Sequence, residues 1–277
     1  MSNARTTTVF ALLLAVGACS SGPPAPPALG YGEGPEEELT YVRADTTLIT
    51  ASMMGQSMEI EQRGEMTLAV AMSNTPEGAD VRMSVVDLSG RITQPMGAPM
   101  TIDESAVDGD LVFSLDRRGR ATVESLPNVE LESSQMVSGS ALAHGFFPRM
   151  PGSAMDGGAS WVDTLSYEGE DAAGLRREES ITTYTVEGPA VFDGMSVLRI
   201  GLTGTSTLSN EFEMGGMALS QSSEVEFEGH VLWDHQRGLM LEHVQRSTGA
   251  GQVNVPIAPV PLPIEIDSRQ VTRLGGS

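Results

Sequence analysis

Apolar and polar residues alternate with a period of two in many segments of this chain. In residues 65–72 this alternation places Met66, Leu68, Val70 and Met72 on one side and smaller or polar residues on the other. Because successive side chains of a strand point to opposite faces, this pattern predicts a strand with one face in a core. Recurrence of the pattern favours an antiparallel β fold over a helical one.

Other segments show the same alternation and are bounded by Gly, Pro, Asn or Asp, which are typical of turns. The predicted strands are residues 46–53, 57–62, 81–85, 109–115, 120–124, 161–167, 181–186, 196–203, 224–233, 239–245 and 264–271. The proline-rich residues 255–263 are expected to be an edge or extended segment, since proline lacks a ladder donor.

One stretch breaks the alternation. Residues 131–144 fit a short helix, and Gly145 is well placed to end it. About ten strands and one helix predict a mainly β fold, with a large antiparallel curved sheet or half-barrel. Two similar β halves, 39–150 and 158–274, are the alternative. A hairpin turn recurs at 116–119 and 234–238, and either duplication or ordinary turn chemistry explains it.

The N-terminus predicts export. The apolar run 9–16 spans only about 12 Å as a helix, too short for a bilayer, so residues 1–18 are expected to be a signal peptide. The following stretch, Val16-Gly17-Ala18-Cys19, resembles the lipobox of bacterial lipoproteins. That resemblance implies cleavage before Cys19 and a membrane anchor through lipid on its sulfur. In the lipoproteins that this stretch resembles, Asp after the cysteine favours the inner membrane, so the resemblance implies that Ser20 directs the protein to the outer membrane, facing the periplasm.

The mature chain is expected to begin with a tether. Residues 19–38 are rich in Pro, Gly and Glu, and they offer too little apolar surface to offset the entropy of ordering. A single β-rich domain is predicted over 39–274. Cys19 is the only cysteine, so no disulfide is expected within the chain.

The charge excludes several classes of function. The chain has 16 basic residues, all of them Arg, against 37 acidic ones, for a net charge of −21. Without lysine there is no Schiff-base or P-loop chemistry. A chain this acidic is not expected to bind nucleic acid, whose phosphates require basic patches.

No pattern of chemistry-bearing residues predicts a catalytic, cofactor or metal site. The four histidines lie in no metal-binding motif, although His230 and His243 are expected to lie opposite each other in a hairpin, with His235 in its turn. Ser138 and Ser140 lie close to His144 in sequence, which leaves a hydrolase as a third hypothesis.

Two further groups have ordinary explanations. Glu224, Glu226 and Glu228 alternate along one strand and are interpreted as a solvated face. The 16 methionines are interpreted mainly as pliable core filler, with a copper site at the turns near Met54 and Met214 as the alternative.

The mature part resembles an uncharacterised β-rich family of bacterial envelope proteins in its Trp161 loop, hairpin series and Asp-x-x-x-Gly turns. In strand content, helix and lipobox it is distantly similar to the half-barrel lipoprotein carriers of the periplasm. This implies a lipid-anchored, non-enzymatic envelope protein that binds a lipid, another apolar ligand or a protein partner. The alternative is a structural accessory subunit. A concave sheet lined by Met66, Leu68 and Val70 would favour the carrier, and a filled core would favour the subunit.

Overall fold

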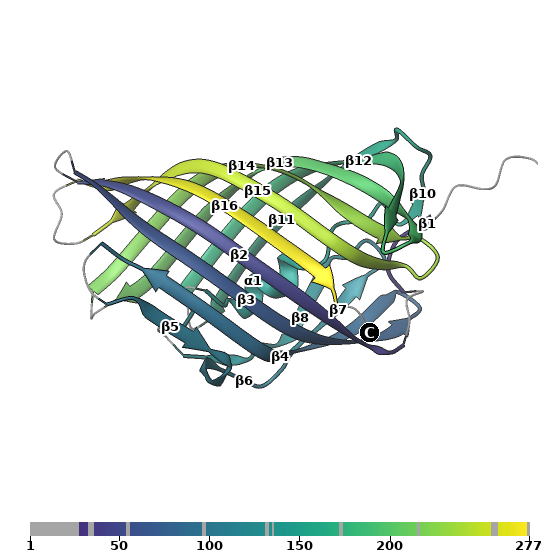
Figure 1. Ribbon diagram of the computed structural model, residues 1–277, viewed down its shortest axis with the longest axis horizontal. Helices are drawn as coiled ribbons and strands as arrows, with labels where there is room; N and C mark the ends of the chain where they lie inside the picture. The colour runs from purple at the N-terminus through teal and green to yellow at the C-terminus, as the bar shows by residue number, and fades with distance from the viewer. Residues whose placement is uncertain are drawn as a thin grey trace, which may run out of the picture.

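The computed structural model shows a long antiparallel sheet that is strongly curved but not closed into a barrel (Figure 1). This architecture confirms the predicted mainly β fold with a large curved sheet. The structure describes residues 28–32, 36–53, 56–95, 98–130, 133–134, 136–171, 174–214, 217–255 and 260–275.

Within the described residues the large sheet has twelve strands. They are β2 (Glu38–Met53), β3 (Gln56–Thr75), β4 (Gly78–Thr93), β5 (Met100–Asp103), β7 (Leu111–Asp116), β8 (Ala121–Ser125), β11 (Ser160–Asp171), β12 (Gly174–Phe192), β13 (Met195–Met214), β14 (Met217–Asp234), β15 (Leu239–Asn254) and β16 (Leu262–Leu274).

Two small sheets and two helical segments complete the described elements. The small sheets pair β1 (Ala28–Leu29) with β10 (Ser153–Ala154), and β6 (Val107–Asp108) with β9 (Asn128–Val129). The helical segments are η1 (Glu104–Ala106) and α1 (Gly139–Gly145).

The strand order brings together the first and last strands of the large sheet. It runs β11-β12-β13-β14-β15-β16-β2-β3-β4-β7-β8, with β5 also paired to β4. The last strand, β16, therefore lies beside β2, with Leu274 opposite Tyr41 and Ile264 opposite Ala51. The segments 39–150 and 158–274 thus contribute to one continuous sheet.

Most strands are longer than the alternation predicts. Residues 181–186, for example, are the middle of the 19-residue β12. Toward its N-terminal end the same inner face carries Ser180, Glu178 and Arg176, so polar residues stand on both faces there. The alternation of apolar and polar residues is therefore lost there, although the hydrogen-bonded pairing of the strands continues. Backbone pairing does not depend on an apolar face.

The predicted helix is present but shorter than expected. It begins at Gly139 rather than at residue 131, because the Ser138 hydroxyl caps it by accepting a hydrogen bond from the Ala141 amide at 3.2 Å. Its end at Gly145 is as predicted. Among the described residues, no helix has the length and apolar character needed to cross a membrane.

A packed apolar core occupies one end of the concave face. Its largest fully buried side chains include Trp233, Tyr41, Phe113, Phe146 and Leu68. The core also contains Val70 and three methionines, Met66, Met72 and Met83. This confirms that these three methionines fill the core. Met66, Leu68 and Val70 are thus packed side chains and do not line an open cavity.

The folded part begins before residue 39. Leu29 and Tyr31 are buried, and the Tyr31 ring meets Trp233 edge to face at 5.2 Å between centroids. The Tyr31 hydroxyl donates to the Pro148 carbonyl at 2.8 Å. Packing therefore extends N-terminal to the predicted boundary at residue 39, because this short stretch supplies two apolar side chains that the core buries. Residues 19–27 of the predicted tether lie outside the described residues.

The gap between the edge strands β11 and β8 is bridged from the inside. Helix α1 contacts both of them. It comes close to β11 because Gly169 lacks a side chain, and a Cβ there would lie 3.1 Å from the Ser140 Cβ. An ion pair between Arg120 and Asp163, 2.8 Å long, also connects the two edges. The sheet is held as a half-barrel by these contacts in place of a closing ladder.

Candidate functional site

Charged side chains face the concave side of the sheet beyond the packed core. Along β2 the buried residues Leu39 and Tyr41 define the inner face, and Arg43 and Asp45 follow in the same phase. Their side chains are 19% and 35% exposed, so solvent reaches this part of the inner face.

These residues belong to a polar group on the inner face of β2, β15 and β16, which we call the polar band. Strand pairing places Gln245, Gln270 and Asp45 side by side, and the neighbouring row contains His243, Thr272 and Arg43. The polar band is defined as Arg43, Asp45, His243, Gln245, Gln270 and Thr272.

The polar band contains an ordered ion pair. The Arg43 Nε donates to Asp45 Oδ2 at 2.7 Å, and its Nη2 donates to Gln270 Oε1 at 3.1 Å. Arg43 and Asp45 carry opposite charges, so this pair contributes no net charge. Planar guanidinium, carboxylate and amide groups that are partly accessible can form directional hydrogen bonds to a bound polar group.

Two members of the polar band are buried without a hydrogen-bond partner among the described residues. These are His243, through both ring nitrogens, and the Thr272 hydroxyl. Burial lowers the pKa of His243 to about 4, with smaller contributions from Arg43 and His230. The imidazole is therefore neutral at pH 7. Buried polar groups are usually hydrogen-bonded, so these unpartnered atoms set His243 and Thr272 apart from the other members of the polar band.

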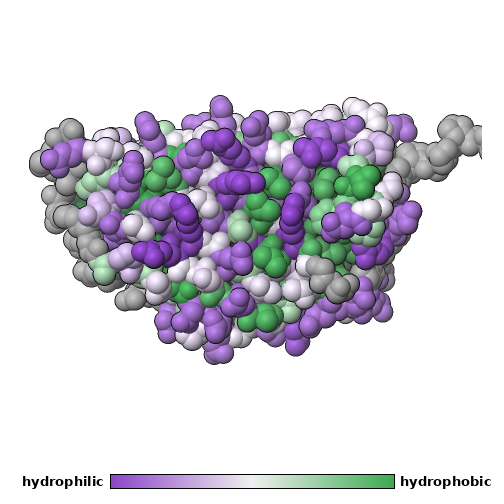
Figure 2. Space-filling view, viewed as in Figure 1, coloured by the Kyte–Doolittle hydropathy of each residue, from purple (hydrophilic) through white to green (hydrophobic). Residues whose placement is uncertain are grey.

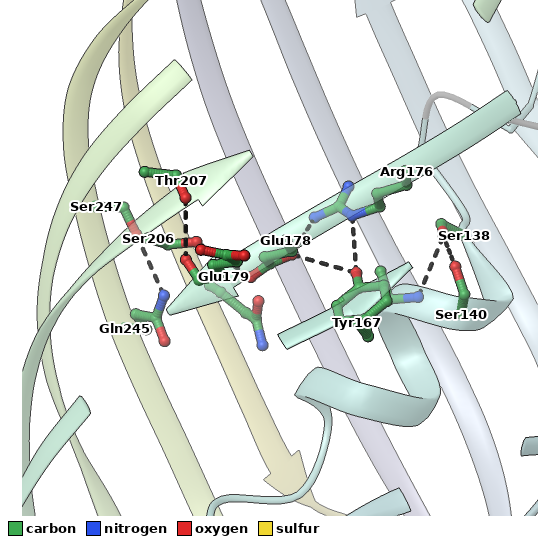
Figure 3. A network of polar contacts seen from close by, with 12 residues as sticks. Ser138, Ser140, Tyr167, Arg176, Glu178, Glu179, Ser206, Thr207, Gln245 and Ser247 are labelled. Carbon is green, nitrogen blue, oxygen red and sulfur yellow. Dashed lines mark hydrogen bonds and ion pairs between the residues drawn. The ribbon is translucent and has the colours of Figure 1, made fainter. Parts of the chain in front are cut away.

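A second polar network lies on the inner face of β11 and β12 (Figure 3). Arg176 donates to the Tyr167 hydroxyl at 2.8 Å and to the Glu178 carboxylate at 2.7 Å. Tyr167 in turn donates to Glu178 at 3.2 Å, and Ser206 reaches the other carboxylate oxygen at 3.3 Å. The side chains of Arg176 and Glu178 are 25% and 21% exposed.

Helix α1 covers this network. The His144 ring stacks on Tyr167, with 4.5 Å between centroids and 23° between the planes. Burial lowers the pKa of His144, and the Arg149 guanidinium lowers it further. Burial raises the pKa of Tyr167 above its ordinary value, although Arg176 opposes this. Both rings are therefore uncharged near neutral pH, as expected for a packed aromatic contact.

The histidine hairpin differs from the prediction. His230 pairs with Val244 and His243 with Val231, so the two histidines are neighbours in the ladder but point to opposite faces. His230 lies on the outer face, where its Nε2 is 3.1 Å from Glu242 Oε1. Arg273 holds the second oxygen of the same carboxylate. The prediction that the histidines face each other is wrong, because their one-residue offset in the ladder reverses the face.

Other predicted residues lie as follows. Glu224, Glu226 and Glu228 are exposed, which confirms their interpretation as a solvated face. Ser138 and Ser140 lie at the start of α1 with 3.1 Å between their oxygens, and Figure 3 shows them beside Tyr167.

The copper hypothesis and the lipidation prediction fall on parts of the chain that the structure does not describe. The side chains of Met54 and Met214 and the whole segment around Cys19 lie outside the described residues. Within the described part, no three His, Cys, Asp or Glu side chains gather in a way that could hold a metal ion.

Two shallow grooves are found on the outer face of the described strands. One of about 640 Å³ runs over β12 to β15, and one of about 460 Å³ lies above Gly201 and Gly229. Small polar side chains and exposed ion pairs such as Arg199–Glu187 line them. Figure 2 shows that polar residues surround separate apolar patches over the visible outer surface.

Five residues of these two polar groups were not predicted from the sequence: Arg43, Asp45, Gln270, Arg176 and Glu178. For β2 there was a usable signal, because two charges stand in phase with Leu39 and Tyr41 on the apolar side of the strand. Gln270 carried no such signal, since its place beside Asp45 depends on a strand pairing between the two ends of the chain.

Comparisons with known proteins add little to this geometry. A comparison with protein families finds no match, and a comparison with curated proteins finds none either. Among solved structures, the chain is similar to DynF from the dynemicin biosynthesis pathway of Micromonospora chersina. The identity is 8% and the TM-score 0.24, over 90% of this chain and 85% of that one. A likeness this weak carries no functional argument.

Proposed function

We propose that this chain is a lipid-anchored, non-enzymatic binding protein of the bacterial cell envelope. In this proposal the concave face of its curved sheet holds a ligand that is at least partly apolar. Cys19 provides the anchor, and the leader directs export toward the outer membrane.

One observation carries the proposal. The inner face of the half-barrel is packed at one end, and farther along the strands it carries partly exposed side chains from β2, β12 and β16. A sheet interior that serves only stability is filled with apolar side chains. Partly exposed charged and amide groups on an inner face are instead typical of a cleft that receives a ligand.

The test is native mass spectrometry of the protein purified from membranes in a mild detergent. A carrier is expected to retain a small molecule, seen as a discrete mass increment that is lost on collisional activation. Delipidation followed by incubation with an envelope lipid extract should restore the same increment. A ligand-free mass under all these conditions would contradict the binding function.

A structural accessory subunit is the second candidate. It is favoured by the burial of Met66, Leu68 and Val70 in the core, where a purely apolar cavity was expected. This candidate predicts a stoichiometric protein partner in the same mass spectrum and no small-molecule increment. A hydrolase remains the third hypothesis.

A further inference from the structure

The inner face changes character along the central strands. Four residues beyond Asp45 and four before Gln270, the pairing places Ile49, Ile60 and Ile266 side by side. We call these three residues the apolar band. At about 3.3 Å per residue, it lies about 13 Å from the Asp45–Gln270 row, farther from the packed core.

The apolar band retains accessible surface. Ile49, Ile60 and Ile266 are each only partly buried, although they point to the same face as Tyr41. The concave face thus contains, in order from the packed core outward, polar groups and then apolar groups. A bound molecule that matches this order has its polar end near the core and its apolar end toward the β2–β3 hairpin.

The charges of the polar band restrict the polar end of such a molecule. Arg43 and Asp45 are one cation and one anion in direct contact, and His243 adds no charge at neutral pH. The pair Arg176–Glu178, on the inner face of β12, is balanced in the same way. A head group with a net charge would be attracted by one member of each ion pair and repelled by the other, so its charge would add little binding free energy. An uncharged or zwitterionic head group can form hydrogen bonds to both the cation and the anion of a pair.

We propose that the concave face binds a single-chain amphiphile head first. The uncharged or zwitterionic head group hydrogen-bonds to the polar band, and the alkyl chain lies along the apolar band. This inference rests on the proposed binding function and specifies its ligand class and orientation.

Isothermal titration of soluble amphiphiles below their micelle concentrations tests the ligand class. The protein is the chain from residue 19 with Cys19→Ser, which keeps every described strand. The probes share a dodecyl chain: dodecylphosphocholine, dodecyl maltoside, laurate and dodecyltrimethylammonium. The zwitterionic and uncharged probes are expected to bind at least tenfold more tightly than the two ionic ones. Equal binding of all four would overturn the assignment of the head group.

Variants on one strand separate the two bands. Gln270→Leu should weaken dodecylphosphocholine binding about tenfold and leave an apolar dye, 1-N-phenylnaphthylamine, unaffected. Ile266→Ser should weaken both ligands. Arg269→Gln, on the exposed opposite face of β16, should change neither. Far-ultraviolet circular dichroism checks that each variant is folded.

Photo-cross-linking tests the orientation. A diazirine at the end of the alkyl chain should label peptides of β2 and β3 that contain Ile49 or Ile60, and a diazirine in the head group should label those that contain Gln245 or Gln270. The reverse pattern would overturn head-first binding.

Two results separate an error in the head-group assignment from an error in the binding function. If dye and amphiphiles bind but Gln270→Leu has no effect, the head-group assignment is wrong and the binding function stands. If wild-type protein binds neither dye nor amphiphile, both fail.

Discussion

Along β14 the side chains alternate between two environments, and this alternation decides what each residue contributes. Trp233 and Val231 are fully buried on the inner face, whereas Glu226 and Glu228 are exposed on the outer face. A bulge between Leu232 and Trp233 shifts the register before the turn, yet the indole remains in the core. The effect of a substitution in β14 on stability should therefore depend on whether the side chain lies on the inner or the outer face, and not on its position along the strand.

Trp233→Ala should destabilise the protein by about 3–5 kcal/mol, since it leaves a large cavity beside Tyr31. Glu226→Ala on the outer face should change the free energy of unfolding by less than about 0.5 kcal/mol. Urea denaturation of the two variants measures both values. A greater loss for Glu226→Ala would show that the glutamate row is a paired or ion-binding site.

Replacing His243 should reduce the loss of stability in acid. Its pKa is lowered to about 4 in the folded protein, mainly by burial, and returns to about 6.5 in the unfolded chain. The unfolded state therefore binds more protons between these values, so stability is complete above about pH 6.5 and falls as the pH drops toward 4. The loss from this group at pH 4.5 is on the order of 2 kcal/mol.

The measurement is urea denaturation at pH 7 and pH 4.5 for wild type and His243→Leu. The carboxylates are common to both proteins, so the difference between the two pH slopes isolates the histidine. Identical slopes would mean that His243 is accessible to protons in the folded state.

Among the secondary-structure elements, helix α1 connects the two edge strands of the sheet, which in a closed barrel would pair with each other. This seven-residue helix contacts both β11 and β8. Met136, just before the helix, fills the space that Gly64 and Gly90 leave on the inner face. A Cβ on Gly64 would lie 2.7 Å from the Met136 methyl group. The helix is too short to be stable alone, so these contacts hold it in place.

Gly169→Val should release α1 from the sheet. The valine side chain would overlap with the Ser140 side chain. Because Ser140 lies in the first turn of α1, relieving this overlap requires the helix to move. Hydrogen exchange should then become faster in residues 139–145 while the central strands stay protected. Gly157→Val is the control, since no atom lies within 4 Å of a Cβ at that position. Unchanged protection of α1 in Gly169→Val would show that the helix is held by other contacts.

In the molecule as a whole, the first and last strands of the large sheet lie side by side. β16 pairs with β2, and the segment before β2 passes over the packed core, where Leu29 and Tyr31 are buried. The folded domain is therefore continuous with the segment that precedes it. In our proposal this segment leads to the membrane anchor.

A chain that starts at residue 39 should be less stable than one that starts at residue 28. The shorter chain loses the β1–β10 pairing and the Tyr31 contacts with Trp233 and Phe147. Loss of one buried aromatic side chain alone costs about 3–5 kcal/mol. Thermal denaturation of the two proteins, followed by circular dichroism, measures the difference. Equal melting temperatures would place residues 28–38 outside the cooperative unit.

Cys19→Ala should abolish lipid attachment. If the lipobox is used, cells supplied with a clickable fatty acid should label the wild-type protein, and the variant should be unlabelled and unprocessed. Gel fluorescence and the mass of the N-terminal peptide report the two effects. Equal labelling of both proteins would reject the anchor.

Which side chains share a face can be predicted from the sequence alone, because the alternation of a strand is a local property of the backbone. Burial of Met66, Leu68, Val70 and Trp233, the exposure of Glu226 and the end of α1 at Gly145 all follow from local pattern.

Which faces meet depends instead on long-range contacts of the folded chain. The contact of Arg43 with Gln270 joins residues 227 positions apart, and the burial of Tyr31 depends on Trp233. Such pairings are set by the order and curvature of the whole sheet, in which each strand's register depends on its neighbours. The polar band therefore exists only in the folded molecule, because its members come from strands at opposite ends of the chain.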